Sequence, residues 1–180
     1  TVTDLPWIRR LVSAPFPDQV TDPYSNAGVI DGFDAGSWSD DGRYFVFATT
    51  ESLVPVDSNG LDDIYLWDER NRSTKLLSYG PDTFTPANGS SLAPRISGNG
   101  RFVVYETAGT NLVPGDSNLH VDIIRQDVQS GARVRVTPDS ANGSARGADL
   151  STDGRYVSFV SDASNLVITP DTNALPDAFR

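Results

Sequence analysis

SDDGRYFVF, residues 39–47, decides the fold, because the chain repeats this stretch twice more. It returns as SGNGRFVVY at residues 97–105 and as STDGRYVSF at residues 151–159. The glycines of the three copies are 58 and then 54 residues apart. Self-similarity at a nearly constant period is the sequence signature of a repeat architecture. The chain therefore consists largely of one structural unit used three times.

A second motif, D-x-N-x-x-x-D, follows each copy of the first. Each instance is preceded by a Leu-Val pair. The motif residues are Asp57, Asn59 and Asp63; Asp116, Asn118 and Asp122; and Asp171, Asn173 and Asp177. Two different motifs that recur in the same order and register exclude coincidence, and they define the boundaries of the repeats.

Each repeat is expected to contain four short strands. The first strand, at 35–39, 92–97 or 148–151, ends in an Asp-Gly or Asn-Gly pair, which favours a type I′ hairpin. The second is continuously apolar, as at 44–48, and this pattern predicts burial of both strand faces. The third starts at the last Asp of the second motif. The fourth is expected at 74–78 and 133–137.

Repeated four-stranded meanders of this length predict an all-β protein and, within that class, a β-propeller. A β-sandwich is the alternative fold, because it also uses many short strands. The expected organisation is an outer strand plus a long connector at 1–34, followed by three repeats at about 35–91, 92–147 and 148–180. Three blades are too few to close a ring, since propellers have roughly four to eight.

Composition excludes several classes of function. The 180 residues carry 24 acidic and 14 basic side chains, for a formal charge of -10, which repels phosphate backbones and anionic membranes. We therefore expect neither nucleic-acid binding nor membrane insertion. The chain has no Cys and one histidine, His120, so a Cys nucleophile is excluded and a catalytic triad would depend on that single base. We expect no enzymatic activity.

The D-x-N-x-x-x-D motifs are the candidate sites. Two carboxylates and one amide oxygen on a tight loop are the hard oxygen ligands that calcium prefers. The same side chains can instead cap the turn by accepting hydrogen bonds from backbone N–H groups. Both interpretations stay open at this point. If the first holds, structural calcium binds at the nine motif residues, and no other cofactor is expected.

The paired motifs resemble the TolB-type β-propeller repeat, whose units read S-x-D-G-R-Y-V-x-F, then S-x-x-x-N-L-V and D-T-N-x-x-x-D. The resemblance extends over about residues 36–180, and the third unit is nearly a consensus copy. It implies blades of a six-bladed propeller, of which this chain would form half. It also implies a periplasmic or extracellular binding or scaffolding module that acts through protein–protein contact. The alternative is an accessory domain of a hydrolase or lyase that acts on a glycan or peptide.

Both ends of the sequence bear on the partner. Residues 7–13 resemble the fourth strands of the repeats, whereas residues 177–180 resemble the beginning of a third strand. A three-bladed arc would expose apolar blade faces and strand edges. We therefore expect a protein partner, which is either another copy of this chain or the remaining blades of the propeller.

Overall fold

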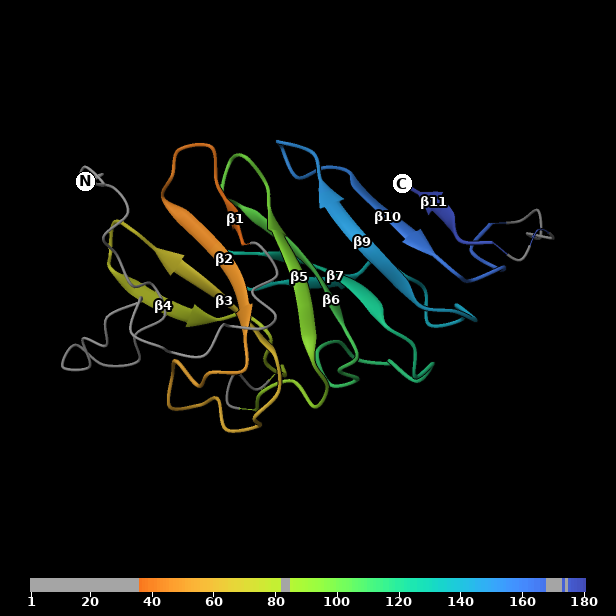
Figure 1. Cartoon of the computed structure of the whole chain (residues 1–180), viewed down its shortest axis with the longest axis horizontal. Helices are drawn as coiled ribbons and strands as arrows, with labels where there is room; N and C mark the ends of the chain where they lie inside the picture. Colours follow the sequence, from red (N-terminus) through yellow and green to blue (C-terminus); the bar gives the residue numbers. More distant parts are fainter. Residues whose placement is uncertain (1–35, 82–84, 168–172, 174) are drawn as a thin grey trace, which may run out of the picture.

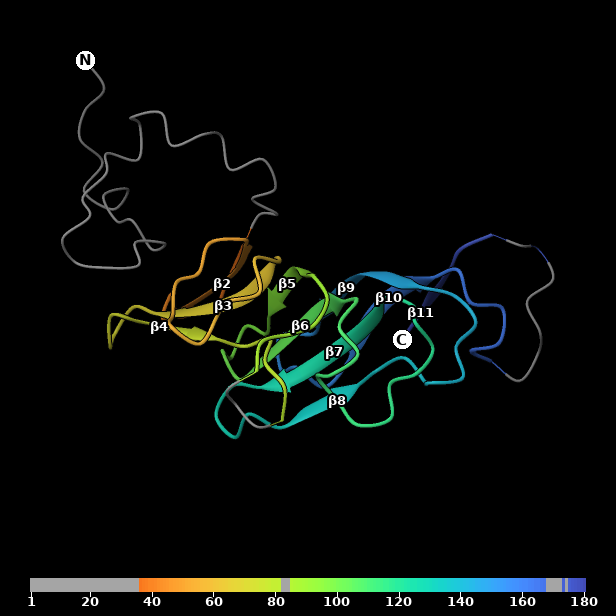
Figure 2. The same cartoon turned by 90° about the horizontal axis from the view of Figure 1, so that it is seen from below.

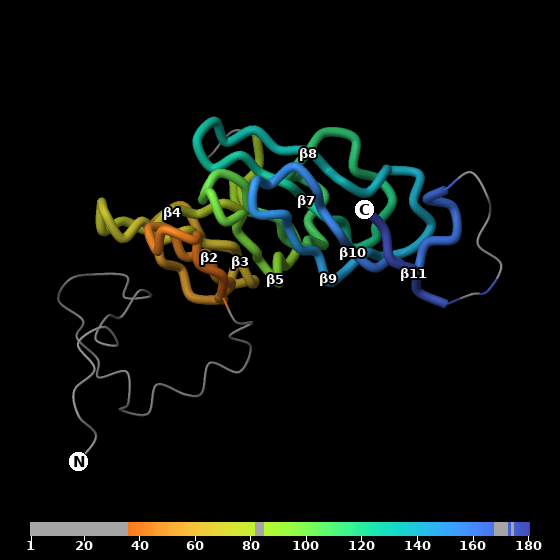
Figure 3. Tube along the Cα trace, turned by 90° about the horizontal axis from the view of Figure 1, so that it is seen from above, coloured from red at the N-terminus to blue at the C-terminus, as the bar shows by residue number. Residues whose placement is uncertain are grey.

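A computed structural model describes residues 36–81, 85–167, 173 and 175–180. Its strands form three antiparallel sheets, which we call blades 1 to 3, and the described residues contain no helix. The blades follow one another along the long axis of the molecule in chain order (Figure 1). Seen from below and from above, they stack face to face (Figures 2 and 3). The all-β propeller-type architecture is confirmed, and the sandwich alternative is not.

Each blade is a meander in which sequence neighbours are hydrogen-bonded. Blade 1 consists of β1 (Ser37–Trp38), β2 (Tyr44–Thr49), β3 (Asp63–Asp68) and β4 (Ser73–Leu76). Blade 2 consists of β5 (Ser91–Ile96), β6 (Phe102–Thr107), β7 (Asp122–Asp127) and β8 (Arg133–Arg135). Blade 3 consists of β9 (Ala145–Leu150), β10 (Val157–Ser161) and β11 (Asp177–Phe179). The predicted outer strand within 1–34 lies outside the described residues.

The second strands are buried on both faces, as their continuous apolar pattern predicts. Val46 and Ala48 of β2 point into the core between blades 1 and 2, where Val103 and Tyr105 of β6 meet them. Val104 points the other way, into the core between blades 2 and 3. Each inner blade therefore shares one core with the preceding blade and another with the following one. We call these its rear and forward faces.

The turn after each first strand differs from the predicted type I′ hairpin. Among the described residues, Asp41, Asn99 and Asp153 do not have a positive φ, and only the glycine that follows each of them does, at +67° to +70°. The Gly42 N–H donates to the Ser39 carbonyl (2.9 Å), so the turn comprises residues 39–42. Its one positive φ is at the last residue, whereas a type I′ turn has positive φ at both central residues. Ser39 Oγ donates to Asp41 (2.6 Å) and accepts from the Tyr44 N–H (3.0 Å), which explains why Ser and Asp recur here.

The first strand of blade 3 also begins earlier than predicted, at Ala145 rather than 148. Pairing between β9 and β10 shifts register between Ser158 and Val160, so β9 contains a bulge. Gly147 lies in this bulge with φ +64°. Because glycine accommodates a bulge, Gly147 lies inside β9, whereas the predicted strand began only after it. Blade 2 has the same irregularity, at Ala93 with φ +50°.

Candidate functional site

The D-x-N-x-x-x-D loop of blade 1 connects β2 to β3 and holds two buried carboxylates. Asp57 is 4% exposed and accepts a hydrogen bond through Oδ2 from the Tyr65 hydroxyl on β3. That hydroxyl in turn accepts from the Leu53 N–H (3.2 Å). Asp57 Oδ1 is buried and accepts no hydrogen bond from the part of the chain that the structure describes.

Asn59 and Asp63 complete this loop, and side chains rather than solvent satisfy them. Asn59 Nδ2 donates to Asp63 Oδ2 (2.7 Å) and to the Ala87 carbonyl of the next connection (2.9 Å). Its Oδ1 accepts from the Leu61 N–H (2.8 Å). Ser78 Oγ donates to Asp63 Oδ1 (2.5 Å). The loop is thereby attached to both β3 and the segment that leads into blade 2.

Among the residues that the structure describes, no cation forms an ion pair with the carboxylates of this loop. Burial raises the pKa of Asp63 to about 6, and the nearby negative charges of Asp57 and Asp62 raise it further. The hydrogen bonds from Ser78 and Asn59 act in the opposite direction but do not cancel the effect of burial. Asp63 therefore takes up a proton under mildly acidic conditions, while most exposed carboxylates remain ionised.

The corresponding loop of blade 2 contains a guanidinium group. Arg135 on β8 lies 3.0 Å from Asp116 Oδ1 and 3.5 Å from Asp122 Oδ2, measured from Nη1. Its Nη2 lies 3.3 Å from Asp139 Oδ1, and Thr137 Oγ donates to Asp122. Burial raises the pKa of the Asp116 carboxyl, the charge of Asp122 adds to this, and Arg135 opposes it. A side chain of the protein thus supplies the positive charge here.

The third motif is only partly described. Asp177 opens β11 opposite Ser161, as the last Asp of the motif does in the other blades. Asn173 Oδ1 accepts from the Leu175 N–H (2.7 Å), the same contact that Asn59 makes with Leu61 and Asn118 with His120. Asp171 lies outside the described residues. The amide of all three motifs therefore caps the N–H group two residues further on.

These contacts correspond to the turn-capping interpretation of the motifs. In the described ranges, no group of three or more acidic or histidine side chains is arranged to hold a metal ion. In blade 1 both Asp63 oxygens accept from protein donors, and Asp57 Oδ1 is the carboxylate oxygen left to a ligand. In blade 2, Arg135 contacts both carboxylates. Calcium binding stays a prediction.

Sequence reasoning missed Tyr65 and Arg135, the residues that most distinguish the two loops. Tyr65 pairs across the sheet with Leu76, and the equivalent pair in blade 2 is Ile124 with Arg135. Aligning the repeats through their third and fourth strands would have revealed this paired difference. His120, in contrast, lies where it was expected, in the second loop, where its backbone N–H donates to Asn118 Oδ1.

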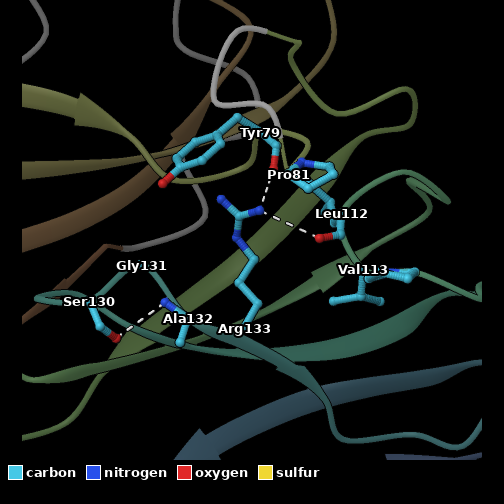
Figure 4. Close-up of a pocket in the computed structure, with 9 residues that line it drawn as sticks. Tyr79, Pro81, Leu112, Val113, Ser130, Gly131, Ala132 and Arg133 are labelled. Carbon is cyan, nitrogen blue, oxygen red and sulfur yellow. Dashed lines mark hydrogen bonds between the residues drawn. The ribbon is translucent and has the colours of Figure 1, made fainter.

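A hollow of about 360 Å³ opens between blades 1 and 2. Its polar lining residues are Tyr79, Ser130 and Arg133, and the other side chains that line it are apolar (Figure 4). The Arg133 guanidinium lies 4.0 Å from the Tyr79 ring centroid and donates to the carbonyls of Leu77 (3.1 Å), Tyr79 (2.5 Å) and Leu112 (3.4 Å). Arg133 therefore joins the two blades, and these backbone contacts occupy the groups that a ligand would need.

No family model and no curated protein matches the chain. Solved structures are similar in fold. TolB from Acinetobacter baumannii is 21% identical at a TM-score of 0.45, over 72% of this chain and 27% of that one. The putative TolB from Agrobacterium tumefaciens is 21% identical at 0.45, over 72% and 38%. The tricorn protease is 16% identical at 0.49, over 81% and 12%. The chain spans well under half of each of these structures.

Proposed function

We propose that this chain is a non-catalytic binding and scaffolding module that acts through protein contacts at its blade faces. The observation that carries the proposal is the aromatic rear face of blade 1. Trp38 and Phe45 have ring centroids 4.7 Å apart, and Phe47 continues the row at 5.5 Å from Phe45. Tyr65 follows at 5.9 Å from Phe47. Phe47 and Tyr65 are buried, so Trp38, which is 49% exposed, is the ring through which this row would meet a partner.

The equivalent positions in the other blades support this assignment. Val103 and Tyr105 occupy them in blade 2 and pack against blade 1, while Val157 and Phe159 occupy them in blade 3 and pack against blade 2. A rear face therefore packs against the preceding blade of the same chain wherever one is described. Aromatic side chains are also the residues enriched at the centre of such interfaces.

Two recurring pairs of charged residues make structural contacts. Arg43 pairs with Asp68 at 3.0 Å and Arg101 with Asp127 at 3.0 Å, at the same place in successive blades. A catalytic pair of charges has no reason to recur in every blade, whereas a structural one does. No helix formed by the described residues is long and apolar enough to cross a membrane. We propose a periplasmic or extracellular location from the repeat resemblance.

Site-specific photo-crosslinking tests the proposed function. A photoreactive phenylalanine analogue replaces Trp38 on the rear face or, as a control, the exposed Gln129 on the hairpin between β7 and β8. The expected result is a discrete protein adduct at position 38 in an extracytoplasmic extract, and none at position 129. Equal labelling at both positions, or turnover of a glycan or peptide by the purified chain, would overturn the proposal.

Calcium at the blade 1 loop is a second proposal. It is supported by Asp57 Oδ1, a buried carboxylate oxygen to which no described group donates. Asp57 Oδ1 would supply a carboxylate oxygen, and the affinity would be weak, because both oxygens of the neighbouring Asp63 already accept hydrogen bonds from protein donors. We do not extend the proposal to blade 2, where Arg135 already neutralises the acidic pair.

A further inference from the structure

The three S-x-[DN]-G-R turns line one edge of the molecule, the upper edge in Figure 1, and successive turns are bonded to each other. The Asp40 N–H in turn 1 (residues 39–43) donates to the Gly98 carbonyl in turn 2 (residues 97–101) at 2.8 Å. The Asn99 N–H in turn 2 donates to the Thr152 carbonyl in turn 3 (residues 151–155) at 3.1 Å. A donor of each turn thus meets an acceptor of the next.

An aromatic ring on each blade also packs against the turn glycine of the following blade. A Cβ atom placed on Gly100 would lie 2.9 Å from Cδ2 of Tyr44, the residue that opens β2. A Cβ atom on Gly154 would lie 2.3 Å from Cδ2 of Phe102, the residue that opens β6. Only glycine fits so close to a ring. The glycine of the motif is therefore a recognition position as well as a turn residue.

Between blades 2 and 3 an arginine completes the contact. The Arg125 guanidinium lies 3.7 Å from the centroid of the Phe102 ring, and its Nε donates to the Gly154 carbonyl at 2.9 Å. Phe102 and Arg125 therefore hold turn 3 from two sides, through the α-carbon of its glycine and through the carbonyl oxygen of the same residue.

Blade 3 presents the same pair of side chains on its forward face. Tyr156 occupies the position of Phe102 and is 49% exposed. Arg180 occupies the position of Arg125, and its guanidinium lies 5.0 Å from the Tyr156 ring centroid. Arg155 lies over the same ring at 5.6 Å. We call Arg155, Tyr156 and Arg180 the forward patch; it is an exposed ring flanked by two guanidinium groups.

Turn 1 is the complementary element. No described atom lies within 4 Å of a Cβ built on Gly42, whereas the equivalent positions on Gly100 and Gly154 meet a ring. Asp40 and Asp41 are exposed, and the Asp40 carboxylate lies against Gly98 of turn 2 in the same molecule. Within the part of the chain that the structure describes, no ring covers the acidic turn of blade 1, and no turn packs against the cationic aromatic patch of blade 3. Turn 1 and the forward patch are therefore complementary in charge, and the uncovered glycine of turn 1 leaves room for the ring of the forward patch.

We propose that the forward patch of one copy binds turn 1 of a second copy of this chain. The inference rests on the proposed function, because it names the partner of a blade face, and it extends the two interblade contacts already present in the structure. The contact joins two different surfaces, so it is heterologous, and two copies complete a closed ring if the rotation between them allows it. Tyr156 then covers Gly42, and Arg180 faces the Gly42 carbonyl.

Disulfide trapping tests the contact in the purified chain, which contains no cysteine of its own. Within the molecule, a Cβ on Gly98 would lie 2.2 Å from Asp40 Oδ2 and 2.6 Å from Thr152 Cγ2, so side chains at this turn position touch between neighbouring blades. Thr152→Cys and Asp40→Cys variants, mixed with oxidised glutathione, should form a mixed-disulfide dimer. Thr152→Cys mixed with Ser130→Cys, another exposed site, should not.

Sedimentation velocity over a range of concentrations provides the second measurement. We expect the unmodified chain to associate, and Tyr156→Ala to raise the dissociation constant by about 10- to 30-fold, as for a central aromatic contact residue. Val134→Ala removes another exposed apolar side chain and should leave association unchanged.

A monomer at every concentration, with no specific disulfide, would overturn this inference. Association that Tyr156→Ala does not weaken would also overturn it, because the copies would then meet elsewhere. In either case a crosslink at position 38 to a different protein would still support the proposed function. The two proposals can therefore fail separately.

Discussion

The acidic loops of blades 1 and 2 share one motif but satisfy its carboxylates in opposite ways. In blade 1 the neutral hydroxyl of Tyr65 donates to Asp57, opposite Leu76 on the next strand. In blade 2 the charged Arg135, opposite Ile124, lies against Asp116 and Asp122. The polar side chain has moved from the third strand to the fourth, and an aliphatic residue occupies the position that it left.

This difference shows that the motif specifies a loop shape and leaves its charge balance to the neighbouring strands. A hydroxyl satisfies one oxygen but adds no charge. Burial, together with the smaller effect of the negative charges of Asp57 and Asp62, raises the pKa of Asp63 to about 6. In blade 2 a guanidinium compensates the pair of carboxylates directly, at the cost of burying a cation. Blade 1 should therefore respond to protons and cations, and blade 2 should depend on its arginine.

Removal of the blade 2 cation should have the largest effect. Arg135→Leu leaves Asp116 and Asp122 buried without a counterion, and it should lower the free energy of unfolding by about 3–5 kcal/mol. Urea denaturation at neutral pH measures the loss. Arg146→Leu is the control, since Arg146 and Asp162 form an exposed pair at 2.7 Å that should be worth less than about 1 kcal/mol. Equal losses in the two variants would show that burial of the Arg135 pair carries no special weight.

Transfer of the blade 1 arrangement into blade 2 sharpens the comparison. Ile124→Tyr combined with Arg135→Leu places a hydroxyl where Tyr65 stands in blade 1 and an aliphatic residue where Leu76 stands. We expect the double variant to recover about 2 kcal/mol of the loss caused by Arg135→Leu, because Asp116 regains a buried donor. Urea denaturation of the unmodified chain, the two single variants and the double variant gives the coupling energy between positions 124 and 135. A double variant no more stable than Arg135→Leu alone would mean that the two solutions are not interchangeable.

The hydroxyl of Tyr65 is the corresponding weak point of blade 1. Tyr65→Phe removes the donor to Asp57 and the acceptor of the Leu53 N–H, leaving both groups buried and unpaired. The expected loss is about 1–3 kcal/mol, measured by thermal and urea unfolding. Tyr156→Phe, at an exposed ring, should change stability by less than about 0.5 kcal/mol. If Tyr65→Phe were as stable as this control, the Tyr65 hydroxyl would not contribute to the stability of the loop.

The pH dependence of stability tests whether Asp63 titrates with a raised pKa. The pKa of Asp63, about 6 in the folded chain, exceeds the unfolded value of about 4, so the native state binds more protons between these values. Protonation of Asp63 thus contributes stability that is fully present below about pH 4 and is lost as the pH rises through 6. Asp63→Asn should weaken this dependence by on the order of 1 kcal/mol between pH 5 and pH 7.

Asp153→Asn is the matched control for that titration. The hydrogen bond from Ser151 and the N–H of Arg155 lower the pKa of Asp153, so its contribution is present above about pH 4 and disappears only below it. The free energies of unfolding of both variants and of the unmodified chain, measured at pH 5, 6 and 7, give the three slopes to compare. If Asp63→Asn and Asp153→Asn show the same slope as the unmodified chain, Asp63 is not the group that titrates.

The order of the strands could be predicted from the sequence because it depends on local signals. The glycine turns and the Asp that opens each third strand follow from motif spacing, and β3, β7 and β11 begin at Asp63, Asp122 and Asp177 as expected. The bulge at Gly147 was misjudged, because glycine reads as a strand breaker unless the pairing partner is known. The type I′ turn was wrong for a similar reason, since Asp-Gly also fits a longer turn.

The site was less predictable, because its distinguishing contacts cross between strands. Motif spacing located Asp57 and Asp116, but their partners Tyr65 and Arg135 lie 8 and 19 residues further along the chain. Only strand pairing shows that these two side chains reach equivalent carboxylates. Contact between turn glycines and rings of adjacent blades was likewise beyond prediction, since it depends on how blades stack rather than on any one repeat.

Calcium should produce the smallest effect, and only in blade 1. With a millimolar dissociation constant, 5 mM calcium would stabilise the chain by about 1 kcal/mol, a shift of a few degrees in thermal unfolding. Asp57→Asn should abolish the shift, because it removes the charge of the oxygen that lacks a donor. Asp116→Asn should leave it intact, since Arg135 occupies that loop. A shift that survives Asp57→Asn would place the ion elsewhere, and no shift in any variant would assign the motif to turn capping alone.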